Sequence, residues 1–79
     1  MKNEYKECES VLVFKTNLTY QKDVERISTE LDKQEGIIKW NVDLSDVDNV
    51  LRIESSKIQP VQIINIIAAA GYNCEELKD

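Results

Sequence analysis

The chain has 79 residues, which is enough for one domain that buries roughly 60% of its unfolded surface and holds no large internal cavity. Its 15 acidic and 10 basic residues give a net charge of −5, which excludes the basic surface that nucleic acids and anionic membranes select. We therefore expect no nucleic-acid partner, and a protein partner with a basic face fits the charge better. With no histidine and two cysteines, most routes to nucleophilic catalysis and zinc binding are missing, so we expect no enzyme.

Residues 1–9 form a polar N-terminal segment, and residues 10–79 are expected to form the domain. The first ten residues have no apolar core behind their basic residue, so they do not read as a signal peptide. No apolar run approaches the length that spans a bilayer, which predicts no membrane insertion. We expect a cytoplasmic protein whose thiols stay reduced.

The first predicted elements are a strand and a helix. Residues 11–14 (VLVF) are β-branched and aromatic, as in a short strand. Four apolar residues then recur at helical spacing, which predicts an amphipathic helix with a narrow apolar stripe: Tyr20, Val24, Ile27 and Leu31. Gly36 is interpreted as the glycine that ends this helix.

The second half continues with two strands, a helix and a last strand. Strict alternation predicts a half-buried strand, with apolar residues at Ile38, Trp40, Val42 and Leu44. Residues 45–49 read as a turn and residues 50–53 as the next strand. Pro60 suits a first helical turn, residues 61–70 continue that helix, and Gly71 closes it. The last strand is expected within residues 72–77.

The predicted order is β-α-β-β-α-β. In so short a chain, two strand-helix-strand units give an α+β, ferredoxin-like fold, with a four-stranded antiparallel sheet and both helices on one face.

The second helix is apolar over most of its circumference, since only Gln62 and Asn65 are polar within residues 61–70. A helix on a sheet needs one apolar face only. Two interpretations remain open. Small alanines and a broad core contact explain the pattern, or the surface around Ile64 serves self-association or a partner.

The stretch NLTYQKD, residues 17–23, lies between the first strand and the first helix. It resembles the metal loop, G-M-T-C-x-x-C, of heavy-metal-associated domains, the family of small copper chaperones and of the N-terminal domains of metal-pumping ATPases. Leu18 stands where the family has its methionine, and Thr19 is retained. Tyr20 and Asp23 stand at the positions of the two metal-binding cysteines.

The resemblance covers residues 17–72 without a gap. Three further family patterns recur. The pattern V-x-x-x-L-x-x-x-x-G-V matches Ile27, Leu31, Gly36 and Ile37, and V-x-V-x-L matches Trp40, Val42 and Leu44. The closing G-Y matches Gly71 and Tyr72. In bacterial chaperones of the family this tyrosine lies beside the metal loop. Lys15 falls where the family has an inward apolar residue, which predicts a one-residue shift or bulge there.

The replaced residues do not suit the metal of the family. Copper(I) is soft and is held by sulfur, whereas a phenol is mostly protonated at neutral pH and a carboxylate is a hard ligand. Hard cations want six or more oxygens, which this loop lacks. We therefore expect no bound metal and no cofactor. Tyr20 either packs over the helix start or fills the space that the metal would take.

The two cysteines are predicted to lie at opposite ends of the first strand. Cys74 should begin the last strand at the loop end, and Cys8 precedes the first strand. A disulfide needs α-carbons within about 7 Å, so no bridge is expected between them.

The sequence does not support a calcium site or an acylphosphatase site. The acidic residues Asp43, Asp46 and Asp48 read as a solvated hairpin turn, because a calcium loop would need a central glycine and a closing glutamate. An acylphosphatase of this fold would need a glycine-rich loop with an arginine, which the chain lacks.

The sequence thus predicts a heavy-metal-associated-type domain without the soft-metal cysteine pair, acting as a protein-interaction module linked to metal handling or transport. The surface implied for the interaction consists of Leu18, Thr19, Tyr20, Asp23, Tyr72 and Ile64. Two alternatives stay open: a metal carrier with a non-standard site, and a homodimeric structural or sensor module.

Overall fold

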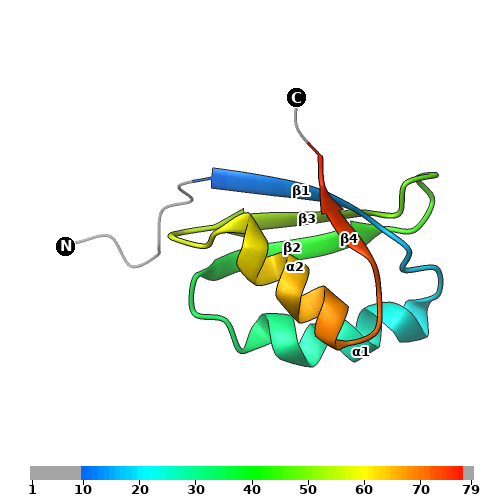
Figure 1. Cartoon of the computed structure of the whole chain (residues 1–79), viewed down its shortest axis with the longest axis horizontal. Coiled ribbons are helices and arrows are strands. Elements are labelled where there is room, and N and C mark those ends of the chain that lie inside the picture. Colours follow the sequence, from blue (N-terminus) through cyan, green and yellow to red (C-terminus); the bar gives the residue numbers. More distant parts are fainter. Residues whose placement is uncertain (1–9, 78–79) are drawn as a thin grey trace.

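The computed structural model describes residues 10–77, so the predicted polar segment 1–9 lies outside the described residues. Six elements follow in the predicted order: β1 Ser10–Thr16, α1 Gln21–Asp32, β2 Ile37–Asp43, β3 Val50–Ser55, α2 Pro60–Ala69 and β4 Cys74–Glu76. The predicted ferredoxin-like βαββαβ fold is confirmed (Figure 1). Among residues 10–77, no helix combines the length and apolar character needed to cross a membrane.

The sheet has the strand order β2-β3-β1-β4, and every neighbouring pair is antiparallel. Both helices lie on the same face of this sheet (Figure 1). Because β1 is central, the loop that follows it begins in the middle of the sheet. β4 pairs with the end of β1, with Thr16 opposite Cys74, and this pairing brings the α2–β4 connection beside the β1–α1 loop.

The alternation of β1 runs unbroken to its end. Leu12, Phe14 and Thr16 are buried, whereas Lys15 is exposed. The shift or bulge predicted at Lys15 is absent, because Lys15 keeps the regular register of β1 with β4 and simply points to solvent. The ladder with β3 holds one register as far as Phe14, but the Thr16 amide donates to the Asp48 carbonyl at 3.1 Å, one residue out of that register.

The expected inward position of Ile38 is wrong. A β-bulge falls between Ile37 and Lys39, and Ile38 is the extra residue, 37% exposed. Ile37 packs against the core in its place, together with Trp40. The reason is that a bulge inserts one residue into a ladder and so shifts the inward alternation of the strand before it.

The core lies between the sheet and the helices. Its buried apolar residues come from β1, α1, β3, α2 and two of the connections: Leu12, Phe14, Leu18, Ile27, Leu31, Leu51, Ile53, Ile58, Ile63 and Ile67. On α2, Ile64 and Ile66 are half-buried and also pack against this core. The broad-contact interpretation of α2 therefore accounts for Ile64, and the exposed apolar surface of α2 consists of Val61 and small alanines.

The interpretation of Gly36 as a helix-ending glycine is wrong. α1 ends at Asp32 with Lys33 as its C-cap, and of the described glycines only Gly71 has a positive φ, +96°. A Cβ on Gly36 would lie 2.6 Å from the Ile58 side chain and 2.7 Å from the Ser56 carbonyl oxygen. Gly36 is therefore required by the close approach of the β3–α2 connection.

We expect Gly36→Ala to lower the free energy of unfolding by about 1–3 kcal/mol, the usual cost of forcing extra atoms into a packed site. Urea unfolding measures this loss. In an Ile58→Ala background the penalty should persist, because the Ser56 carbonyl belongs to the backbone and cannot rotate away. Unchanged stability in Gly36→Ala would show that the β3–α2 connection does not press on this position.

Candidate functional site

Residues 17–20 form the β1–α1 loop, which is anchored at both sides. The Thr16 hydroxyl donates to the Asn49 carbonyl at 2.6 Å and accepts from the Leu18 amide at 3.1 Å. On the other side, the Asn73 amide donates to the Asn17 side-chain oxygen at 2.8 Å. The loop is therefore tied to the β2–β3 turn and to the α2–β4 connection at once.

Leu18 holds the loop onto the core. Its side chain is fully buried among the core residues. Neighbouring Thr19 is exposed, and its hydroxyl donates to the Asn17 carbonyl at 3.0 Å.

Asp23 is the buried acid of this loop, with only 8% of the residue exposed. One carboxylate oxygen, Oδ2, accepts from the amides of Thr19 at 3.2 Å and Tyr20 at 3.0 Å. The other, Oδ1, accepts from the Tyr72 hydroxyl at 2.8 Å. As the third residue of α1, Asp23 thus reaches back to the N-cap amide, as the acid of a capping box does. A buried carboxylate with three donors is well satisfied.

These contacts hold the pKa of Asp23 below its ordinary value of 3.8. The hydrogen bond from Tyr72 is the largest cause, followed by the Tyr20 amide, while burial opposes the shift. Arg26 Nη1 in turn donates to the Tyr72 hydroxyl at 3.3 Å. The three side chains therefore form a hydrogen-bonded chain, in which Arg26 donates to Tyr72 and Tyr72 donates to the Asp23 carboxylate.

Tyr20 does not take either position predicted for it. Its residue is 62% exposed, so its ring neither packs over the helix start nor fills the loop. As the N-cap of α1 it has an extended backbone, which turns its side chain outward. The Lys22 ammonium lies 5.8 Å from the centre of the ring, within the range of a cation–π contact. The buried stripe of α1 begins at Asp23 instead and continues through Ile27 and Leu31.

Cys74 lies at the loop end of β4, as predicted, and its thiol is free. Burial raises its pKa to about 12, so the thiol stays protonated at neutral pH. Cys8 lies outside the described residues, and the predicted absence of a Cys8–Cys74 bridge stays a prediction. Within residues 10–77, no three His, Cys, Asp or Glu side chains come close enough together to hold a metal ion.

The acidic residues Asp43, Asp46 and Asp48 lie at the end of β2 and in the β2–β3 turn, as expected. Asp43 Oδ1 accepts from the amide and the hydroxyl of Ser45, Asp46 accepts from the Asp48 amide, and Asp48 lies 3.8 Å from the Lys15 ammonium. Their carboxylates are thus engaged in local turn contacts.

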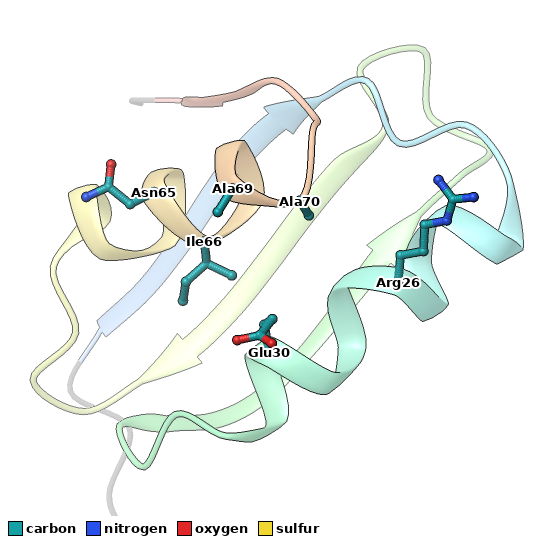
Figure 2. A pocket seen from close by; sticks show the side chains of 6 residues that line it. All are labelled: Arg26, Glu30, Asn65, Ile66, Ala69 and Ala70. Atoms are coloured by element: carbon teal, nitrogen blue, oxygen red, sulfur yellow. The ribbon is translucent and has the colours of Figure 1, made fainter.

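An open groove of about 590 Å³ separates α1 from α2 (Figure 2). Its apolar wall consists of Ile66, Ala69 and Ala70, and Arg26 and Glu30 line it from α1. Arg26 therefore borders this groove and contacts Tyr72 as well. No local sequence pattern indicates the contact between Arg26 and Tyr72, because 46 positions separate the two residues.

No protein-family model and no curated protein matches the sequence. Solved structures of the same architecture do match. The yeast copper transporter domain Ccc2a is 24% identical over 87% of this chain and 96% of that domain, with a TM-score of 0.73. The copper(I)-loaded first domain of the human copper chaperone for SOD1 is 17% identical over 84% of this chain and 89% of that domain, with a TM-score of 0.71.

A third structure is the apo HMA domain of a copper chaperone for superoxide dismutase. It is 15% identical over 99% of this chain and 79% of that one, with a TM-score of 0.71. The fold is that of a heavy-metal-associated domain. At these identities the likeness concerns the fold alone.

We expect Asp23→Asn to remove part of the acid sensitivity of folding. Because the folded state lowers the pKa of Asp23 below 3.8, its ionisation stabilises the fold fully above that value, and this contribution is lost as the pH falls through the folded pKa. The difference in free energy of unfolding between wild type and Asp23→Asn should therefore be largest near neutral pH and shrink below pH 3.8. Urea unfolding at a series of pH values measures it.

Tyr72→Phe provides the matching measurement, since it removes the main cause of the shift. The pKa of Asp23, followed by NMR of its carboxyl carbon, should rise toward 3.8 in this variant. A wild-type pKa at or above 3.8, or one that Tyr72→Phe leaves unchanged, would refute the network.

Proposed function

We propose that this chain is a heavy-metal-associated-type domain that lacks the soft-metal cysteine pair and acts as a protein-interaction module in metal handling or transport. The observation that supports this most directly is the position of Asp23. Its carboxylate accepts from two loop amides and from Tyr72, so the loop keeps its shape through the chain's own groups.

The physical reason lies at the start of α1. A helix N-terminus carries unpaired N–H groups and a partial positive charge, which favour an anion. In the family that this chain resembles, two metal-binding cysteines stand there. Here the Asp23 carboxylate supplies the negative charge permanently. The domain therefore needs no metal to order its loop, and its contacts with a partner are independent of metal.

Of the residues implied for the interaction, Ile64 packs against the core from α2, and those at the loop end divide into two groups. Leu18 is fully buried and Asp23 nearly so, so both support the surface from behind. Thr19 and Tyr20 are exposed and form the part that a partner would touch, with half-buried Tyr72 beside them. An exposed tyrosine is a common anchor of protein interfaces. The chain's charge of −5 favours another protein with a basic face as that partner.

A complex supports the choice of an interaction role. The solution structure of Atx1–Cu(I)–Ccc2a, which matches this chain with 24% identity and a TM-score of 0.72 over 87% of it and 96% of that chain, is a complex between proteins. A role without catalysis and a cytoplasmic location complete the proposal. The alternative of a metal carrier is less favoured, because the Asp23 carboxylate already accepts three hydrogen bonds and burial raises the pKa of the Cys74 thiol.

We expect the reduced wild-type protein to bind no stoichiometric copper(I) in competition with a strong copper(I) chelator. The loop offers a phenol and a hydrogen-bonded carboxylate, and copper(I) prefers sulfur. Chelator absorbance during a titration measures the binding. A one-to-one complex that survives the competition would replace this proposal with the carrier alternative.

We expect the double variant Tyr20→Cys/Asp23→Cys to bind one copper(I) per chain, and each single variant to bind far more weakly. Two thiols at the start of α1 would have lowered pKa values, because the helix N-terminus favours thiolate. Loss of the three hydrogen bonds of Asp23 should destabilise the apo form, and copper(I) should raise the melting temperature of the double variant by mass action.

Chelator competition and thermal unfolding of the same samples measure both effects. The single variants are the matched controls, because each places one thiol in the same loop. A folded double variant that binds no copper(I) would show that the loop path has departed from a metal loop, and that the likeness ends at the fold.

A further inference from the structure

β2 is an edge strand of the sheet, with β3 on one side. Within residues 10–77 no strand lies on its other side, and α1 runs alongside it (Figure 1). The outer backbone groups of an edge strand are a template for another strand. Which groups point outward follows from the pattern of the ladders.

Two hydrogen bonds fix that pattern independently. The Leu77 amide donates to the Val13 carbonyl. The backbone N–H and C=O groups of Val13 therefore point toward β4, and those of its neighbours in β1 point toward β3. Arg52 lies opposite Val13 in β3. Because hydrogen-bonded pairs alternate in antiparallel ladders, the backbone N–H and C=O groups of Arg52 point toward β2. Arg52 pairs there with Asn41.

The second route starts at the other end of β2. The Ser56 amide donates to the Gly36 carbonyl at 2.8 Å, so the backbone groups of Gly36 point toward β3. Following the alternation through the bulge, those of Asn41 point toward β3 as well. Trp40 and Val42 therefore point their N–H and C=O groups out of the sheet edge.

We propose that two copies of this chain pair through β2, antiparallel, about a twofold axis at Asn41, and so form one continuous eight-stranded sheet. In this register Trp40 of each copy forms a hydrogen-bonded pair with Val42 of the other. Lys39 lies directly opposite Asp43 of the other copy, on the face of the sheet away from the helices.

Charge selects this register. Lys39 and Asp43 are both exposed, and opposite charges placed directly across an antiparallel pair attract. A twofold pairing that keeps the two sheet faces aligned must be centred on a residue. Centring it on Trp40 sets Lys39 against Asn41, and centring it on Val42 sets Asp43 against Asn41. Only the Asn41 centre forms both ion pairs of the twofold dimer.

The helix layer is compatible with the same axis. Trp40 Nε1 donates to Asp32 Oδ1 at 2.9 Å, which places the end of α1 near β2. Arg26 and Glu30 line the groove toward α2 (Figure 2). By helical spacing Val24 and Ser28 therefore lie on the opposite side of α1, toward the β2 edge. Both are half-buried and uncharged. Asp32, the next residue of this row, also lies on that side, where its carboxylate accepts from Trp40.

The bulge limits the pairing. It falls between Ile37 and Lys39, and bulges terminate regular pairing at sheet edges. The paired segment is therefore residues 39–43 of each copy. A contact this short gives a weak dimer, and the twofold symmetry closes it without further growth.

Sedimentation equilibrium from about 10 µM to about 1 mM tests the proposal, because mass action populates a weak dimer only at high concentration. We expect a reversible monomer–dimer equilibrium. Lys39→Glu should raise its dissociation constant about tenfold or more, because two attractive pairs become repulsive. The double variant Lys39→Glu/Asp43→Lys should restore dimerisation. Lys22→Glu, with the same charge change on α1, should have a much smaller effect.

Amide hydrogen exchange by NMR gives a second readout on the unmodified chain. The amides of Trp40 and Val42 should gain protection as the concentration rises, whereas that of Asn41 is already protected by β3. A monomer at the highest concentration, a dimer indifferent to Lys39→Glu, or unchanged exchange at Trp40 and Val42 would each overturn the proposal. Each of these results leaves the copper(I) and loop experiments unaffected.

Discussion

The carboxylate of Asp23 is the interaction on which the loop end of the molecule depends. Leaving a buried charge without partners is costly, and this one has two loop amides and a tyrosine hydroxyl as donors. Those donors come from two places, the β1–α1 loop and Tyr72 in the connection between α2 and β4. One side chain thus joins the start of one helix to the end of the other.

The same end of the molecule is held by a second, polar set of contacts. Thr16 faces inward where an apolar residue would be the simpler choice, and its hydroxyl connects the Asn49 carbonyl with the Leu18 amide. Leu18 then closes the core beneath the loop. Because buried polar groups must be paired, Thr16 and Asp23 together leave the loop little freedom. This agrees with a loop whose order comes from the chain itself.

Periodicity predicted most of the fold because the element order depends on local patterns. The alternation from Trp40 through the end of β2 to Leu44, and the helical spacing of Val24, Ile27 and Leu31, are properties of short windows. The bulge at Ile38 was missed because two adjacent isoleucines fit either inward register, and only the ladder with β3 decides between them. Gly36 was misinterpreted for a related reason, since its constraint comes from Ile58 and Ser56, which follow β2 and β3 in the chain.

The site shows the same limit more sharply. Tyr20 continues the apolar spacing of α1, so the pattern assigned it to the buried stripe. At the N-cap, however, the backbone is extended, and helical spacing no longer predicts the direction of a side chain. The family resemblance singled out Asp23, but the hydrogen bond that it accepts in the fold comes from Tyr72, which is 49 positions away. An acid at the third position of a helix is the one local sign that could have indicated it.

The proposed interaction surface and the proposed dimer edge use separate parts of the fold. Tyr20 and Thr19 lie at the end of the sheet where β1 stops, whereas the outward groups of Trp40 and Val42 lie along its side. A twofold axis at Asn41 would leave both loops open to solvent and would present two copies of the loop surface in one particle. Two linked sites bind a partner with two matching sites more tightly than either site alone. A weak dimer would then strengthen the loop contact without altering the loop, and the internal carboxylate of Asp23 would keep each copy of that surface in the same shape.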